Sequence, residues 1–269
     1  MEETSFVSST GTRLAGLIWP GNPTRTITLV HGLASNARTW IAVGDLLNQF
    51  GAQVVAYDQR SHGRSERVDV GFDFSTYSAD LEAVVRDVTS ESPVTVGQSW
   101  GGNVVIDHAA RYRTLASVGI DGGFIRLRAR FESWEACASQ LAPPRFDGAT
   151  RQAVEGYLRT AHPDWTDQAI LGALGNFEDQ PGGLVLPYLR FDDHMRILRS
   201  LWEHDPLAIL PTVDSPTRVV LASPGLVTRE EVELLGFDEI TVVNGDHDLH
   251  LQQPETIAKL IWEATPWDR

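Results

Sequence analysis

The sequence predicts an α/β protein whose mostly parallel central sheet carries helices on both faces, with a helical cap inserted late in the chain. Short β-branched segments alternate with segments of helical spacing over residues 13–123, a pattern typical of parallel sheets. The alternation stops over residues 124–214 and resumes afterwards. We therefore expect a core of residues 1–123 and 215–269, and a cap of residues 124–214 between the sixth and seventh core strands.

The first part of the core consists of predicted strands that alternate with predicted helices. Each strand segment is rich in Val, Ile or Thr and ends at Gly, Pro or polar residues. Strands are expected at Arg13–Trp19, as an edge strand, and at Thr26–Val30, Gln53–Tyr57, Val94–Gly97 and Leu115–Ile120. Helical spacing of apolar residues predicts helices over Trp40–Phe50, over Tyr77–Val88 and from Trp100 to His108.

The same reasoning predicts the elements of the cap and of the last part of the core. Between proline-rich breaks, the cap is expected to be helical at residues 131–140, 150–160, 166–174 and 192–201. The core then continues with strands Thr217–Ala222 and Ile240–Val243 and a short helix near Glu230–Leu235. A closing helix is expected to begin near Pro254, since proline suits a first helical turn.

The cap contains aromatic and histidine side chains. Three tryptophans either line a pocket beneath the cap or pack within it: Trp134, Trp165 and Trp202. Three histidines are interpreted as surface or capping residues: His162, His194 and His204.

Composition argues against several classes of protein. The net charge of −14 opposes binding to nucleic acid or to anionic membranes by the whole surface. No apolar run approaches the ~18 residues of a membrane span, and the acidic first residues show no signal-peptide pattern. Cys137 is the only cysteine, so no disulfide can form within the chain. These features indicate a cytoplasmic protein.

The pentapeptide Gly97-Gln98-Ser99-Trp100-Gly101 lies between a predicted strand and a predicted helix. A serine on such a tight turn is held in strained backbone geometry with its oxygen pointing outward. The residues two before and two after it crowd together, so only glycine fits there. The helix that follows directs its first N–H groups at the same place, where an anion can be stabilised. The alternative is an ordinary glycine-rich turn with a solvated serine.

Polar side chains recur at the carboxyl ends of the predicted strands. His31, Asp58, Ser99 and Asp121 each stand at or just past such an end. Sites in open parallel sheets form at this edge. The sequence therefore predicts that the functional site lies there.

Four motifs in this order make the chain resemble the α/β-hydrolase fold family, in its lid-bearing serine esterase-like branch. The resemblance covers residues 13–123 and 217–263. The motifs are His31-Gly32, Asp58-x-Arg60-x-His62-Gly63-x-Ser65, Gly97-x-Ser99-x-Gly101-Gly102 and Gly245-Asp246-His247.

The resemblance implies a role for each motif. Ser99 corresponds to the nucleophile and His247 to the general base, with His250 as the alternative histidine. The oxyanion hole corresponds to the backbone N–H groups of Leu33 and Trp100. No metal and no organic cofactor is implied. The pair His247-x-x-His250 does not lie on a predicted helix and lacks a third ligand, which disfavours a metal site.

The orienting acid departs from the family's commoner pattern. Most relatives carry it after the seventh strand, where residues 219–227 contain no carboxylate here. A minority carry it after the sixth strand, where Asp121 stands. We therefore assign Asp121, and the order of serine, acid and histidine agrees with the family. A plain turn aspartate at Asp121, with Glu230 as the acid, is the alternative.

The motif over residues 58–65 and His31 contain polar side chains of types that are often catalytic. The resemblance implies instead that Asp58, Arg60 and His62 tie the fourth strand to its neighbours. In the same way, His31 is expected to brace the oxyanion loop.

These features predict a hydrolase that acts on a carboxylic ester or a lactone of a small molecule through an acyl-enzyme at Ser99. Two alternatives remain at this point: a hydrolase that cleaves a carbon–carbon bond beside a ketone, as in a dienoate substrate, and a ligand-binding member without catalysis. Neither the substrate nor the oligomeric state follows from the sequence.

Overall fold

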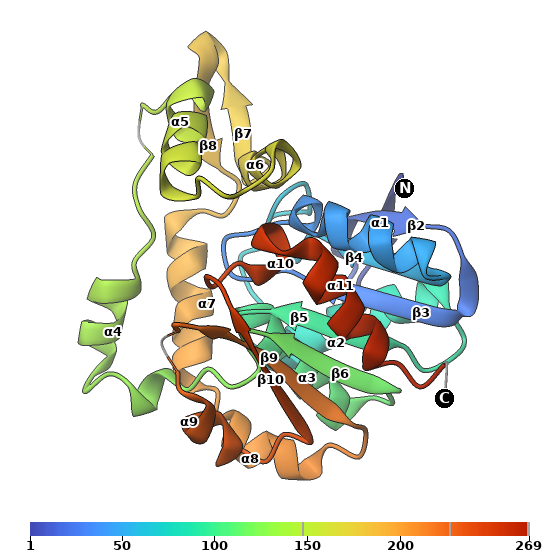
Figure 1. Cartoon of the computed structure of the whole chain (residues 1–269). Helices are drawn as coiled ribbons and strands as arrows, with labels where there is room; N and C mark the ends of the chain where they lie inside the picture. The colour runs from blue at the N-terminus through green and yellow to red at the C-terminus, as the bar shows by residue number, and fades with distance from the viewer. Residues whose placement is uncertain (147, 226, 268–269) are drawn as a thin grey trace.

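The main sheet contains eight strands in the part of the chain that the structure describes. The computed structural model describes residues 1–146, 148–225 and 227–267. The strands lie in the order β1-β2-β4-β3-β5-β6-β9-β10 (Figure 1). Their bounds are β1 Glu2–Val7, β2 Arg13–Trp19, β3 Asn22–Val30, β4 Ala52–Tyr57, β5 Val94–Gln98, β6 Ala116–Ile120, β9 Thr217–Ser223 and β10 Glu239–Asn244. Strand β2 runs antiparallel to β1 and β4, and the other neighbours pair in parallel, which confirms the mostly parallel sheet.

The amino-terminal edge of the sheet differs from the prediction. Arg13–Trp19 is not an edge strand, because all six residues of β1 pair with its residues 13–18. Only Phe6 of β1 is buried, so the strand carries almost no apolar pattern by which it could be found. Strand β3 also begins earlier than expected, at Asn22, and its register shifts between Asn22 and Thr26.

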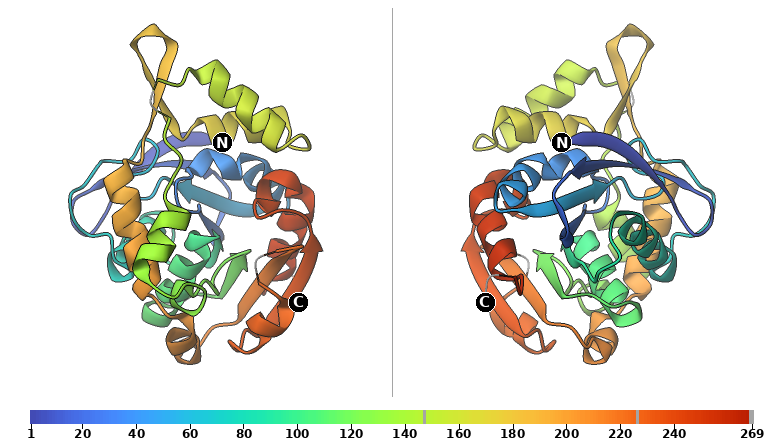
Figure 2. Two further views of the ribbon diagram at one scale, coloured as in Figure 1. Left: turned by 90° about the vertical axis from the view of Figure 1, so that its left-hand side faces the viewer. Right: turned by 90° about the vertical axis from the view of Figure 1, so that its right-hand side faces the viewer.

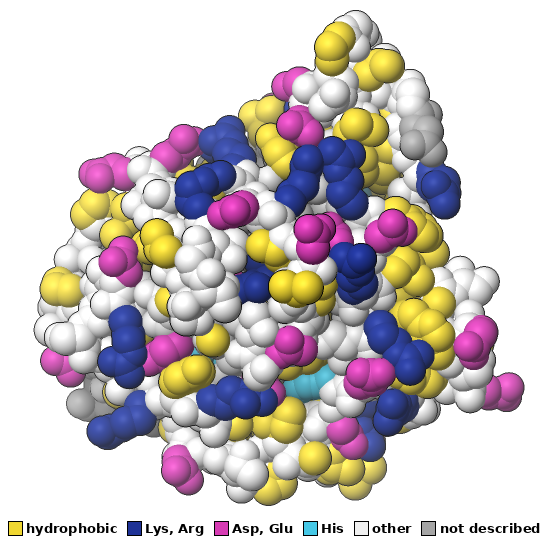
Figure 3. Space-filling model, turned by 180° about the vertical axis from the view of Figure 1, so that it is seen from behind, with side chains coloured by type: hydrophobic (Ala, Val, Ile, Leu, Met, Phe, Trp, Pro, Cys, Tyr) yellow, Lys and Arg dark blue, Asp and Glu magenta, His cyan; other side chains and the backbone are white. Residues whose placement is uncertain are grey.

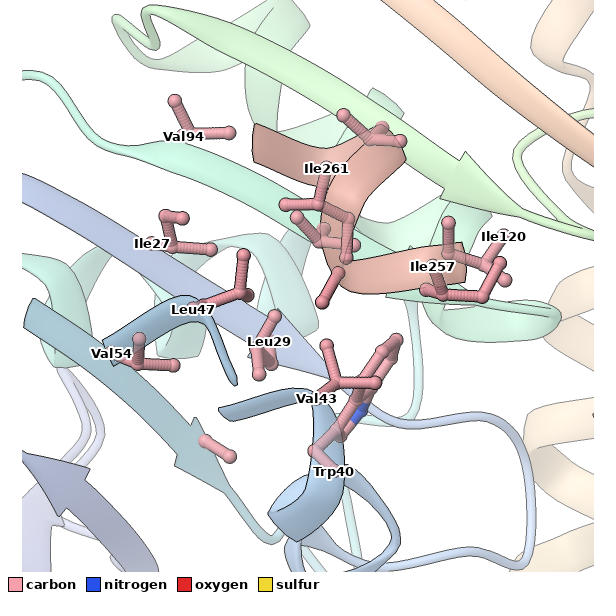
Figure 4. Packing of buried hydrophobic residues seen from close by; sticks show 14 of the residues in the cluster. Ile27, Leu29, Trp40, Val43, Leu47, Val54, Val94, Ile120, Ile257 and Ile261 are labelled. Atoms are coloured by element: carbon pink, nitrogen blue, oxygen red, sulfur yellow. The ribbon is translucent and has the colours of Figure 1, made fainter. Parts of the chain in front are cut away.

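Helices cover both faces of the sheet. Helices α1 (Ile41–Gln49) and α11 (Pro254–Glu263) lie on one face, and α2 (Phe74–Val88) and α3 (Trp100–Arg111) lie on the other (Figures 1 and 2). Figure 4 shows α1 and α11 side chains packed on strand residues such as Ile27 and Leu29. The neighbouring strand residues Val30 and Val55 belong to the second core, with α2 and α3. Burial on both faces explains why these strands read as continuous apolar runs.

The described part of the segment between β6 and β9 contains all four helices expected there and one further short α-helix. They are α4 (Trp134–Leu141), α5 (Arg151–Ala161), α6 (Asp167–Leu174), α7 (Phe191–Glu203) and the short α8 (Pro206–Ile209). Between α6 and α7, where only a break between helices was expected, the structure has an antiparallel hairpin of β7 (Phe177–Gln180) and β8 (Leu184–Pro187). The turn holds Gly182 and Gly183 at positive φ. The strands are only four residues long and β7 carries two acids, so they lack a strand pattern.

This segment makes two separate apolar contacts. Helix α7 places Ile197, Leu198 and Leu201 in the core that also contains α2 and α3. Helices α5 and α6 and the hairpin share a small core of their own and project beyond the sheet (Figure 1). A polar contact helps to join α6 to the sheet domain, because Asn36 Nδ2 donates to the Gly172 carbonyl at 2.9 Å. On the face in Figure 3, acidic and basic side chains are interspersed.

Candidate active site

Ser99 lies between the last residue of β5 and the first residue of α3. Its backbone has φ 53° and ψ −124°, a strained conformation for a residue with a side chain. A Cβ atom at Gly97 would collide with the Gly101 carbonyl, and one at Gly101 would collide with the His31 carbonyl. The spacing of the two glycines around the serine therefore has the steric cause that the sequence suggested.

Asp121 follows β6 directly and also has a positive φ, of 43°. Its N–H donates to the Val220 carbonyl at 2.7 Å, and its Oδ1 accepts from the Ala222 N–H at 3.0 Å. Its Oδ2 lies 2.5 Å from Nδ1 of His247, which comes from the loop after β10. Parallel neighbours β6, β9 and β10 thus bring residues 121 and 247 together.

The two alternatives for the acid and the histidine lie elsewhere. Glu230 is exposed in the first turn of α9 (Arg229–Glu233), and its own backbone N–H and Thr228 lower its pKa. His250 is buried against Trp40, with ring centroids 4.5 Å apart. Burial lowers the pKa of His250 to about 3, so its imidazole is neutral at physiological pH.

The electrostatic setting of His247 favours its charged form. Partial burial alone would lower its pKa, but the hydrogen bond to Asp121 and the charges of Asp248, Asp121 and Asp246 outweigh it. The pKa of His247 is therefore raised above its ordinary value. The side chain is 52% exposed, so the ring can be reached from the adjoining cavity.

A cavity of about 480 Å³ brings the predicted site residues together. Ser99, Asp121, His247, Leu33 and Trp100 all line it. Within the described residues, no hydrogen bond joins the Ser99 hydroxyl to His247; contacts of this kind often tighten only when substrate binds. Much of the remaining wall is apolar, formed by residues such as Phe124, Ile125, Leu127, Phe131, Leu198 and Leu201.

Buried histidines brace the loop that contains Leu33. Nδ1–H of His31 donates to the Gly32 carbonyl at 2.7 Å, and Nε2 accepts from the Gln59 N–H at 3.0 Å. Nε2 of His62 accepts from the Ala34 N–H at 3.3 Å. Burial lowers the pKa of His31 to about 4 and that of His62 well below its ordinary value, so both rings stay neutral. The contacts agree with a structural role for these two residues.

The loop after β4 is held by its charged side chains. The Asp58 carboxylate accepts from the N–H groups of Ala37 and Arg64 at 2.7 and 2.8 Å. Arg60 forms two 2.7 Å bonds with Asp80 of α2 in a fully buried pair. These residues tie β4 to η1 (Ala37–Trp40) and α2, as the sequence led us to expect.

The histidines of the inserted segment correct one expectation. His194 is neither a surface nor a capping residue, because it is 7% exposed and lies within α7. His204 is also buried, at 9% exposed, but it is the residue that caps the carboxyl end of α7, which was one of the two expectations. His194 lines the cavity on α7, and His204 lies 3.7 Å from the Phe74 ring. His162 is partly exposed and follows α5 as its capping residue. The helical pattern shows which face of α7 is apolar but not what covers its polar residues.

The tryptophans of this segment pack on their neighbours. Trp134 and Trp202 form an edge-to-face pair with ring centroids 6.2 Å apart. Trp165 stacks on His162 at 3.8 Å. These contacts favour the packing interpretation over the pocket interpretation.

Some side chains around the site carry no motif by which the sequence could have revealed them. Arg130, Gln140 and His194 line the cavity from the inserted segment. Gln98, beside the nucleophile position, donates from Nε2 to the His247 carbonyl at 3.1 Å. Among the described residues, no three His, Cys, Asp or Glu side chains gather so as to hold a metal ion. Every helix in the described part of the chain is too short or too polar to span a bilayer.

Comparison with known proteins bears on the family and the fold. The chain matches the model of the Alpha/beta hydrolase family over residues 29–260. It is 36% identical over 105 residues to a non-heme haloperoxidase of Rhodococcus erythropolis, which covers 39% of this chain and 38% of that protein. It is 36% identical over 94 residues to a bifunctional esterase/perhydrolase of Acinetobacter calcoaceticus, which covers 35% of this chain and 34% of that protein.

These matched segments span less than half the length of the two curated relatives. The crystal structure of an E-2-(acetamidomethylene)succinate hydrolase has a TM-score of 0.80 with this chain. That likeness extends over 98% of this chain and 99% of the other, at 22% sequence identity. It is a likeness of fold.

Proposed function

The chain belongs to the alpha/beta hydrolase family, and we propose that it hydrolyses a carboxylic ester or a lactone through an acyl-enzyme formed at Ser99. His247 is the general base and Asp121 the orienting acid. The observation that carries the proposal is the 2.5 Å contact between His247 Nδ1 and Asp121 Oδ2, in a cavity that Ser99 also lines. A serine hydroxyl is a weak nucleophile until a base removes its proton, and this arrangement supplies the base.

The first half of the reaction forms the acyl-enzyme. Ser99 Oγ attacks the substrate carbonyl carbon while its proton passes to Nε2 of His247. Asp121 accepts from Nδ1–H, so it fixes the tautomer and stabilises the imidazolium. The carbonyl oxygen becomes an oxyanion, which the N–H groups of Leu33 and Trp100 bind, a contribution of roughly 3 kcal/mol per donor. Trp100 opens α3, so its N–H has no intrahelical acceptor.

The second half releases the acid. Collapse of the tetrahedral intermediate breaks the bond to the leaving oxygen, which takes the proton from His247 and departs as the alcohol. Water then loses a proton to His247 and attacks the acyl carbon. The second collapse restores the Ser99 hydroxyl and frees the carboxylic acid. In a lactone, both products remain in one molecule.

The cavity favours a substrate of moderate size with an apolar portion. Its volume of about 480 Å³ and its Leu, Ile and Phe wall suit an uncharged acyl or alkyl group. The segment over residues 124–214 contributes most of that wall, which supports its role as a cap that selects the substrate. The name of the Acinetobacter relative includes an esterase activity, in agreement with this substrate class.

The test is a panel of esters, lactones and a dienoate combined with a fluorophosphonate probe. We expect hydrolysis of apolar esters or lactones, and one probe molecule on Ser99 by peptide mass spectrometry, which ester substrate prevents. Products from the dienoate alone would instead favour carbon–carbon cleavage. An unlabelled Ser99 together with no turnover of any substrate would favour a ligand-binding protein.

The pH dependence of the rate should report His247. The neutral imidazole is the active base, and the raised pKa of His247 means that this form is lost at a higher pH than for an ordinary histidine. We expect kcat/KM to fall as the pH drops through a midpoint above 6.5, measured with an uncharged ester from pH 5 to 9. A profile without slope in this range, with chemistry limiting, would rule His247 out as the base.

A further inference from the structure

Gln98 occupies the variable position just before the nucleophile, yet its side chain is only 3% exposed. Its Nε2 donates to the backbone carbonyl of His247 at 3.1 Å and lies 3.4 Å from Oδ1 of Asp248. Its Oε1 lies so close to Gly32 that a Cβ atom there would collide with it. One amide therefore contacts the histidine loop while it packs on the loop proposed for the oxyanion hole.

The other bonds of the histidine loop come mainly from its own end of the chain. The Asp246 N–H donates to Gln252 Oε1 at 2.9 Å, and Gln253 Nε2 donates to the Asn244 carbonyl at 2.7 Å. The Asp248 N–H donates to Asp246 Oδ1 at 2.9 Å. These bonds shape the loop, but they do not place it relative to Ser99.

We propose that Gln98 is a positioning residue that sets the distance and direction of the His247 imidazole relative to Ser99. The inference rests on the proposed function of the site. Gln98 and Ser99 are consecutive residues, so the elbow that places the nucleophile also places the amide that holds the histidine backbone. A shift of about 1 Å in a reacting group can cost on the order of 100-fold in rate.

The amide also matters for the bond between His247 and Asp121. Holding the His247 carbonyl fixes the loop, so the ring keeps Nδ1 within 2.5 Å of Asp121 Oδ2. That hydrogen bond is the largest of the interactions that raise the pKa of His247. Loosening the loop weakens the bond, and the pKa of His247 then falls toward its ordinary value.

The first test compares Gln98→Met with a matched control, Gln53→Met. Methionine keeps the length of the side chain but has no N–H donor. Gln53 is also a buried strand glutamine, and its Nε2 donates to Thr26 Oγ1 and the Val88 carbonyl at 3.1 and 3.0 Å, in the first half of β4. We expect Gln98→Met to lower kcat by roughly 10- to 100-fold with little change in KM. Gln53→Met should keep the wild-type kcat.

The second readout is the pKa of His247, measured by NMR titration of ¹⁵N-histidine-labelled protein and assigned with His247→Gln. We expect this pKa to fall in Gln98→Met and to stay unchanged in Gln53→Met. Gln98→Glu keeps the shape but replaces the N–H donor by a second oxygen acceptor, so it cannot bind the His247 carbonyl and should lower kcat as Gln98→Met does. A fall of the His247 pKa in Gln98→Met that is absent from Gln53→Met would not arise from a general loss of stability.

The outcomes separate this inference from the proposed function. Equal kcat and equal His247 pKa in Gln98→Met and Gln53→Met would overturn the positioning role, even in an active esterase. A wild-type protein that cleaves no ester, but whose His247 pKa still falls in Gln98→Met alone, would overturn the proposed function and uphold the positioning role. If Gln98→Met does not fold, Gln98→Glu decides by its rate, because a kcat equal to that of Gln53→Met would overturn the positioning role.

Discussion

Replacement of Ser99 by alanine is expected to lower kcat by on the order of 10⁶-fold while the protein remains folded. The change removes the atom that forms the acyl-enzyme, and the remaining groups cannot substitute for it because they act on that oxygen. Alanine meets the same backbone strain at φ 53° as serine does, so stability should hardly change. The rate is measured with the best ester of the panel, and folding by thermal unfolding.

The matched control for that variant is Ser117→Ala. Ser117 is fully buried, whereas Ser99 lines the cavity, and the Ser117 hydroxyl lies 3.0 Å from Thr95 Oγ1 inside the sheet. We expect Ser117→Ala to keep kcat near the wild-type value. If Ser99→Ala retained turnover within tenfold of the wild type, the acyl-enzyme mechanism would have to be abandoned.

Mild acid should destabilise the fold strongly, because several buried histidines stay neutral in the folded state. Burial lowers the pKa of His31 and His204 to about 4 and that of His250 to about 3. In the unfolded chain, these residues titrate near pH 6.5. Protons therefore bind the unfolded state first as the pH falls, and the stabilisation present above pH 6.5 is lost below it.

The expected size of this effect is large. At pH 5, each such histidine costs about 2 kcal/mol relative to pH 7, so three cost about 6 kcal/mol. This is comparable with the whole stability of many domains. His62 and His194, whose pKa values are also lowered, act in the same direction. His247, and the buried carboxyls Asp58 and Asp80 with raised pKa values, act in the opposite direction.

Urea unfolding at pH 7, 6 and 5 measures the loss directly. We expect the free energy of unfolding to drop by several kcal/mol over this range, with an unchanged dependence on urea. His204→Phe provides a paired variant, because phenylalanine can replace the ring that lies on Phe74 without a site for a proton. Its loss should be smaller by about 2 kcal/mol. A wild-type free energy of unfolding that stays level from pH 7 to pH 5 would contradict the prediction.

Local rules accounted for the central part of the fold. The strands next to the site are buried on both faces and rich in Val and Ile, so their apolar runs were plain. Ser99 was found because its tight turn leaves room only for glycine at positions 97 and 101. Those two glycines are visible in the sequence. The contact between Asp121 and His247 joins residues 126 positions apart. It was expected from the family resemblance and the order of strands, because neither residue carries a local signal of the other.

The features that were not predicted depend on contacts with residues far away in the sequence. Strand β1 buries only Phe6, and it forms a strand because it pairs with β2. The burial of His194 and His204 follows from what packs over α7, which spacing does not reveal. The role of Gln98 depends on a backbone carbonyl 149 residues away. Every residue has a backbone carbonyl, so the sequence does not show which carbonyl Gln98 binds.

The left-handed backbone at Ser99 lowers the stability of the fold at the residue that carries the proposed nucleophile. Glycine would occupy the same position without a side chain to strain, and relief of such strain is worth about 1–3 kcal/mol. Selection for thermal stability alone would therefore favour glycine at position 99. The resulting protein would be more stable but would lack the hydroxyl of the proposed nucleophile. On the proposed mechanism, serine is retained at position 99 because only its hydroxyl can form the acyl-enzyme.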